Sequence, residues 1–276
     1  MSDPAPSFLA RNQFLIYRLF SLAGLVPVGA FLVVHLLTNA SVLAGAGVFQ
    51  SRVDLIHSIG EAALPFVEWA FIFLPMLFHA AVGFVIIANG LPNVGSYPYV
   101  GNVRYTLQRA TGMIAFVFIL VHVAHMHKMG GWLDPSHRWL GRFDPDAASS
   151  SAAVALQPAV WTILYVIGLL SAVFHFANGL WTLGITWGLW TSPAAMRRAN
   201  AVSVVVGLAL AAAGLGSVAR LREIGGDETK LKQAQATERA MLEDRERRER
   251  LMQGESDGAA PHGVPAAAPA GTRGGG

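Results

Sequence analysis

Four histidines lie inside the most apolar stretches of the chain, and their side chains are potential metal ligands. They are His35 in FLVVHLL, His79 in PMLFHAA, His122 in ILVHVAH and His175 in SAVFHFANG. An ionisable group inside a bilayer is costly, so its presence there usually has a functional reason. A single imidazole can be satisfied by a carbonyl of a neighbouring helix, but four of them, one in each of four apolar stretches, favour a shared function.

The stretches that carry these histidines are long enough to cross a membrane. Of 276 residues, 53% are hydrophobic and only 13% are charged, and five tracts contain no Asp, Glu, Lys or Arg: 19–51, 69–103, 110–127, 147–196 and 199–219. About 20 apolar residues span a bilayer core of roughly 30 Å. Lipid requires such segments to be helical, and they lack the alternation of barrel strands. The sequence predicts an all-α integral membrane protein with five transmembrane helices near 14–42, 64–90, 108–127, 158–189 and 199–220.

The distribution of charge predicts the orientation and the domain organisation. Lys and Arg near the spans are more numerous on the side of the N-terminus, which in a bacterial-type cytoplasmic membrane favours a cytoplasmic N-terminus and an outer C-terminus. Residues 1–222 form the membrane domain. The tail, 223–276, is first rich in both charge signs and then low in complexity, which predicts a solvated or partner-binding helix followed by disorder. The net charge of only +3 does not indicate nucleic-acid binding.

The depths of the four histidines sort them into two pairs. Counted along antiparallel helices, His35 and His122 lie in the outer half of the membrane, and His79 and His175 lie in the inner half. Two facing imidazoles are suitable axial ligands for one haem iron, so two levels predict two b-type haems in a bundle of the first four helices. His125 is a rival for His122. The absence of cysteine excludes iron–sulfur clusters and covalently attached haem from this chain.

Small residues accompany the histidines on the same helix faces. Gly83 and Gly179 each follow a histidine by four residues, and Gly168 and Gly24 precede one by seven and eleven. These glycines provide either clearance for a flat macrocycle or close helix contacts.

Four longer segments resemble a known family. They are RLFSLAGLVPVGAFLVVHLL, EWAFIFLPMLFHAAVG, LQRATGMIAFVFILVHV and LSAVFHFANGLWTLGITWG. Together they resemble the cytochrome b membrane-anchor subunit of succinate dehydrogenase and fumarate reductase, in its single-subunit, five-helix, two-haem form. The resemblance implies His122 rather than His125 as the ligand. It covers about 14–220 and does not extend to the tail.

The resemblance also implies partners and a reaction. A flavoprotein subunit carrying FAD would exchange electrons with succinate or fumarate, and an iron–sulfur subunit would relay them to the inner haem. The outer haem would exchange electrons with a quinone, usually menaquinone. This chain would be the anchor and quinone-site subunit of the enzyme, and the sequence leaves the physiological direction open.

Two further groups of residues are candidates for the sites that this reaction requires. Arg18, Ser21 and Arg109 lie near the predicted inner ends of helices, where they would contact the propionates of the inner haem. Asp54, His57 and Glu61 lie on the predicted outer side, where quinone chemistry needs groups that pass protons, and Asn39 and Trp132 would help to form the pocket. Each of these has the alternative of being an ordinary solvated loop residue.

Two other functions remain alternatives at this point. One is a dihaem cytochrome b of another quinone-linked dehydrogenase. The other is a histidine-lined membrane transporter, which is less favoured because the sequence lacks inverted repeats and its histidines pair by depth.

Overall fold

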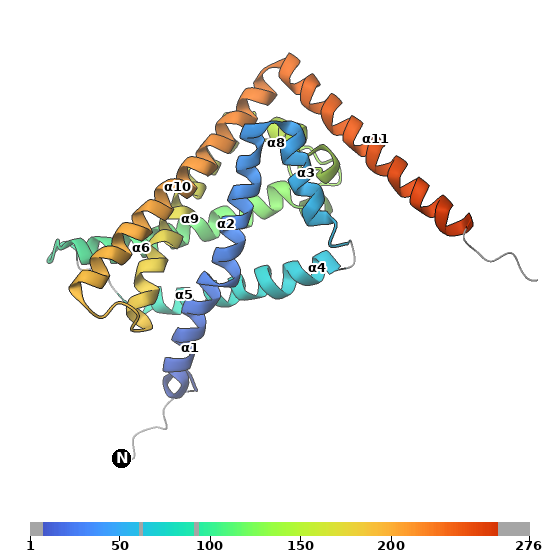
Figure 1. The fold of residues 1–276 in the computed structure, drawn as a ribbon. Helices are drawn as coiled ribbons and strands as arrows, with labels where there is room; N and C mark the ends of the chain where they lie inside the picture. Colours follow the sequence, from blue (N-terminus) through green and yellow to red (C-terminus); the bar gives the residue numbers. More distant parts are fainter. Residues whose placement is uncertain (1–7, 61–62, 91–93, 259–276) are drawn as a thin grey trace, which may run out of the picture.

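The protein is an all-α integral membrane protein, as the sequence predicts. The computed structural model describes residues 8–60, 63–90 and 94–258, and within these ranges it contains helices and no strand (Figure 1). Five segments are long and apolar enough to span a membrane: Arg11–Ala44, Ala63–Ala88, Val100–Met126, Ala159–Thr186 and Pro193–Gly226.

Proline residues divide the first two of these segments. The first consists of α1 (Phe8–Leu25) and α2 (Pro27–Ala40), and it ends in a 3₁₀ turn, η1 (Ser41–Ala44). The second consists of α4 (Ala63–Glu68), a π-helical turn η2 (Trp69–Phe73) and α5 (Leu74–Ala88). Proline has no N–H to donate and clashes with the preceding turn. The break before Pro27 and the π turn before Pro75 are the usual ways in which a helix accommodates it.

The other three spans pack side by side. Helix α9 (Ala159–Thr186) packs on α6 (Val100–Met126) and on α10 (Pro193–Gly226), while α2 packs on α10 and α5 packs mainly on α1. Helix α6 begins at Val100 rather than near 108 because the polar residues of its first turns find partners in the bundle. Arg104 donates from Nε to Asn178 (2.8 Å) and from Nη1 to Asn200 (2.7 Å).

A compact cap closes one end of the spans. It contains α3 (Ala46–His57), the short α7 (Gly130–Leu133), the turn η3 (Pro145–Ala147) and α8 (Ala148–Ala155). Phe49, Val53 and Leu156 are almost fully buried there against Leu221 and Ile224 of α10. We call this the α3 end of the protein, and the opposite end, where α1 begins, the α1 end.

The charged tail forms a long helix, α11 (Glu228–Gly258), that turns back from the top of α10 (Figure 1). Asp227 caps its start by accepting hydrogen bonds from the backbone N–H groups of Thr229 (2.9 Å) and Lys230 (3.1 Å). Most of its side chains are exposed, but Ala234 and Glu238 are buried against the cap. Only the part of the predicted tail up to residue 258 is described.

Candidate functional site

The four histidines of the spans form two facing pairs. The rings of His35 on α2 and His122 on α6 have centroids 5.7 Å apart. Those of His79 on α5 and His175 on α9 have centroids 6.0 Å apart. The pairing by depth is therefore the arrangement in the structure, with the second pair nearer the α1 end.

Backbone carbonyls orient both rings of the His79–His175 pair. Nδ1 of His79 donates to the Phe20 carbonyl oxygen at 2.9 Å, and Nδ1 of His175 donates to the Gln108 carbonyl oxygen at 2.9 Å. Phe20 also stacks on the His79 ring, with centroids 4.2 Å apart. A proton fixed on Nδ1 leaves the lone pair on Nε2, which is the form of imidazole that binds a metal.

A tyrosine hydroxyl links the other pair to the rival histidine. Tyr165 Oη lies 3.1 Å from Nδ1 of His122 and 2.9 Å from Nδ1 of His125. The His125 ring is 1% exposed and stacks on Trp161 with centroids 3.7 Å apart. His125 is thus packed among protein side chains, whereas the partly exposed His122 ring faces His35. The third histidine of this stretch, His127, lies 3.4 Å from Glu68.

All four paired histidines line one cavity of about 1770 Å³ that continues from the α1 end to the α3 end. A pocket for one drug-sized ligand measures about 300–1,000 Å³, so this cavity has room for more than one large group. Two glycines bring helices close to the rings of His79 and His175. A Cβ added at Gly24 would lie 2.4 Å from His79, and one at Gly112 would lie 2.8 Å from His175.

The other glycines that the sequence singles out differ in their surroundings. A Cβ at Gly168 would collide with the Phe118 ring at 2.0 Å, so this glycine serves close packing. Gly83 and Gly179 line the cavity, and a Cβ there would meet its nearest neighbours at 3.7 Å and 3.9 Å. The macrocycle-clearance interpretation therefore suits Gly83 and Gly179 better than Gly168.

The geometry of each pair fits a haem iron. A metal–imidazole bond is about 2 Å long and the ring centre lies about 1 Å further, so two imidazoles on opposite sides of one iron have centroids about 6 Å apart. Both measured separations are close to this value. Within the described residues there is no group of three or more His, Cys, Asp or Glu that suits a bare metal ion. Pairs of neutral imidazoles in an apolar cavity suit an iron that brings its own macrocyclic ligands.

The predicted propionate contacts lie at the α1 end, in different settings. Ser21 and Arg109 line the cavity. Arg109 donates to the Gly90 carbonyl, and its Nη2 donates to the Ile86 carbonyl at 3.0 Å, so its guanidinium also caps the end of α5. Arg18 does not line the cavity; its guanidinium lies over the rings of Phe14 (4.4 Å) and Trp187 (4.9 Å).

Only some of the predicted quinone-site residues line the cavity. Asn39, Asp54 and His57 all line the cavity at the α3 end. Trp132 is 80% exposed and does not contribute to the cavity. Glu61 lies outside the described residues. Nδ1 of His57 donates to the Val53 carbonyl at 3.0 Å, which leaves the lone pair of the neutral ring on Nε2.

Several residues at the site escape sequence reasoning. Tyr165, Gln108 and Gly112 act through partners far away in the chain, and Arg245 reaches the cavity from the tail. Only two of these residues belong to a motif that the sequence offers: Gln108 and Gly112 are both part of LQR-x-TG.

A multi-spanning helical bundle with facing imidazole pairs in one cavity has the architecture of a membrane cytochrome b. No protein-family model matches the chain. Over 210 residues, which are 75% of this chain and 96% of the relative, it is 34% identical to the succinate dehydrogenase cytochrome b558 subunit of Bacillus subtilis (strain 168). The chain belongs to the family of succinate dehydrogenase cytochrome b subunits, as the resemblance of its histidine segments predicts.

Proposed function

We propose that this chain is the membrane-anchor, electron-transfer and quinone-site subunit of a succinate:quinone oxidoreductase, and that it holds two b haems. His79 and His175 hold one iron, and His35 and His122 hold the other. The observation that carries the proposal is the pair of ring separations, 6.0 Å and 5.7 Å, within one continuous cavity. A bis-imidazole haem supplies reversible one-electron transfer at a site that excludes other ligands.

The residues of the chain keep each imidazole in one orientation and protonation form. The carbonyls of Phe20 and Gln108 hold the protons of His79 and His175 on Nδ1. With the iron bound at Nε2, Nδ1 of His122 would keep the ring proton and donate a hydrogen bond to the Tyr165 hydroxyl. His125 is a positioning residue for this hydroxyl and not an iron ligand.

Membership of the family supports the proposed partners, and the distribution of Lys and Arg in the sequence supports the proposed orientation. A flavoprotein with FAD and an iron–sulfur subunit dock at the α1 end, on the cytoplasmic side, and Ser21 and Arg109 bind propionates there. Menaquinone binds at the α3 end, where Asn39, Asp54 and His57 line the cavity. An amide donates a hydrogen bond to a quinone carbonyl, and an imidazolium or a protonated carboxyl group can also transfer a proton to it. The chain itself performs no chemistry on succinate.

The test is purification of the complex from membranes through a tag on this chain. We expect a flavoprotein and an iron–sulfur protein to co-purify, a b-type reduced-minus-oxidised spectrum with two haems per chain, and succinate-dependent reduction of a naphthoquinone. A purified chain without haem would contradict the proposal. Haem with other partner subunits would instead indicate another quinone-linked dehydrogenase.

A further inference from the structure

The tail helix α11 is fixed to the cap by a buried carboxylate. Glu238 is 2% exposed and accepts hydrogen bonds from the backbone N–H groups of Ser149 (2.6 Å) and Ser150 (3.0 Å) and from the Ser150 hydroxyl (2.6 Å). A buried carboxylate is tolerated only when such bonds satisfy it. These bonds therefore set the register of α11 along the start of α8.

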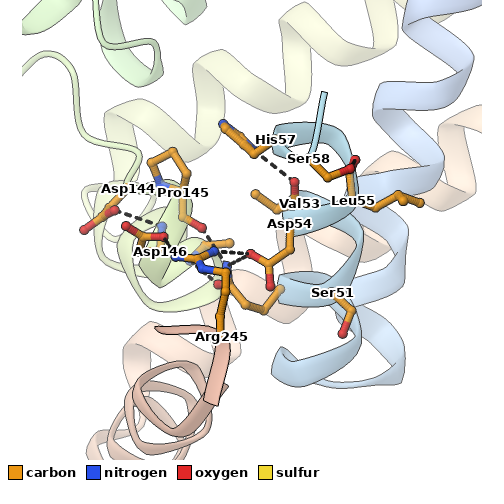
Figure 2. Close-up of polar contacts among 12 residues, drawn as sticks. Ser51, Val53, Asp54, Leu55, His57, Ser58, Asp144, Pro145, Asp146 and Arg245 are labelled. Carbon is orange, nitrogen blue, oxygen red and sulfur yellow. Dashed lines mark hydrogen bonds and ion pairs between the residues drawn. The ribbon is translucent and has the colours of Figure 1, made fainter. Parts of the chain in front are cut away.

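Arg245, further along α11, reaches two carboxylates of the cap. Its Nη1 lies 3.2 Å from Asp54 on α3, and its Nη2 donates to Asp146 of η3 (Figure 2). Residues seven apart on a helix share a face, so the register that Glu238 sets also aims Arg245 at α3. Arg245 is partly buried, with 37% of its side chain exposed.

Asp54 is held from two sides. The Gln50 amide donates to Asp54 Oδ1 at 2.9 Å and to the Pro145 carbonyl at 2.6 Å, while its own oxygen accepts from the Ala148 N–H at 3.0 Å. Gln50 is 2% exposed, so this side of the bridge is rigid. Arg245 holds Asp54 from the other side. Among the described residues it is the only charged side chain in contact with Asp54.

One face of α11 also lines the cavity at this end. Its contributors are Leu242, Arg245, Glu246 and Glu249, which follow the spacing of one helix face. His57 lies one turn after Asp54 on α3 (Figure 2), and both residues line the cavity. The tail helix is therefore a wall of the chamber that contains the candidate quinone residues.

We propose that Arg245 is a positioning residue of the quinone site: it holds the Asp54 carboxylate at the edge of the chamber, one helical turn from His57, and α11 closes the chamber behind it. This proposal rests on the proposed function, since it requires that a quinone bind at the α3 end. An ionised carboxylate only accepts hydrogen bonds, so Asp54 would act on a bound quinone through a donor such as the His57 imidazole or a water. Holding the carboxylate in one place makes that arrangement available more often than free rotation would.

The test compares variants of the purified complex with succinate as donor and a water-soluble naphthoquinone as acceptor. We expect Arg245→Gln to raise the KM for the quinone by about tenfold and to shift the pH profile of quinone reduction. Haem content and succinate-dependent reduction of an artificial dye at the partner subunits should be unchanged. Arg245→Lys should recover part of the loss. Arg248→Gln is the matched control, because Arg248 pairs with Asp244 on α11 itself.

Two further variants separate positioning from simple anchoring of the helix. If Arg245 acts through Asp54, Arg245→Gln should raise the KM no further in an Asp54→Asn background. Glu238→Gln weakens the anchor of the whole helix and should lower thermal stability, whereas Arg245→Gln should change the KM and the pH profile with little loss of thermal stability. An unchanged KM in Arg245→Gln, or additive effects of Arg245→Gln and Asp54→Asn, would overturn the proposal while the wild-type complex still reduces quinone. A wild-type complex that reduces the dye but no quinone would overturn the proposed function and this inference with it.

Discussion

Nδ1 of His175 lies 2.9 Å from the carbonyl oxygen of Gln108, and the side-chain amide of Gln108 returns a hydrogen bond of 3.1 Å to the carbonyl of His175. These reciprocal bonds join α9 to α6 at the level of the His79–His175 pair. Asn178 extends the link, because its amide donates to Gln108 Oε1 at 2.7 Å and its oxygen accepts from Arg104. The His175 ring, a glutamine, an asparagine and an arginine thus form one hydrogen-bonded chain.

Asn178→Ala should destabilise the protein without removing haem. The variant leaves Gln108 Oε1 and Arg104 Nε without their partner, and an unsatisfied buried polar group costs about 1–3 kcal/mol. Thermal unfolding of the purified complex would measure the loss. Asn89→Ala is the control, since the Asn89 amide is exposed and bonds within its own helix to Val85. Equal unfolding temperatures for the two variants would argue against the chain of bonds.

Gly112→Ala should disturb the His79–His175 site specifically. The added Cβ would lie 2.8 Å from Cε1 of His175, so the ring must move from the position that faces His79. We expect the haem content to fall to about half of the wild-type value, because overpacking is relieved by displacement of the ring. Gly101→Ala on the same helix is the control, because nothing lies within 4 Å of its added Cβ. Full haem content in Gly112→Ala would show that the ring tolerates the shift.

Tyr165→Phe should retain both haems but change the reduction potential of one. If Nε2 of His122 binds the iron, its Nδ1 carries the ring proton and donates to the Tyr165 hydroxyl, which would make this imidazole a stronger ligand and favour oxidised iron. Loss of this hydrogen bond should raise the midpoint potential at the His35–His122 site by about 30–60 mV, on a scale of 59 mV per tenfold for one electron. Redox titration followed by optical spectra would measure this. A shift confined to the other haem would contradict the assignment of His122.

The proposed orientation predicts that the membrane potential drives quinone reduction. Electrons that pass from the cytoplasmic side to a quinone at the outer side move down the potential, which is worth about 2.3 kcal/mol per charge at 100 mV. An uncoupler should therefore slow succinate-driven reduction of quinone in intact cells. Dye reduction by the detergent-solubilised complex serves as the control and should be unaffected. A rate that stays the same or rises with the uncoupler would contradict this orientation.

The residues that sequence reasoning located are those whose signal is local. His35, His79, His122 and His175 are visible because each interrupts an apolar run, and regular helical rise places them in depth. The rise per residue of a helix does not determine which side chains of neighbouring helices touch. Depth along the helix therefore left His122 and His125 as rivals, and the choice of His122 came from the resemblance. In the structure His122 faces His35, whereas His125 is buried against Trp161.

The tail illustrates the other limit of sequence reasoning. Glu238 and Arg245 belong to a segment whose mixed charges predict a solvated helix. Their partners, Ser149, Asp54 and Asp146, are about 90–190 positions away in the chain. Nothing local distinguishes Arg245 from Arg248, yet only the former bridges to α3. Ion pairs between distant segments are set by the register of packing, which a local pattern does not encode.

Haem content per chain in single histidine variants tests the central claim most directly. We expect two haems in the wild-type chain and in His125→Ala, and one in each of His35→Ala, His79→Ala, His122→Ala and His175→Ala, because each of these leaves one imidazole pair intact. Redox titration should show the same haem missing from His79→Ala and His175→Ala, and the other missing from His35→Ala and His122→Ala. Two haems in His122→Ala together with a loss in His125→Ala, or a different grouping of the four variants, would contradict the account.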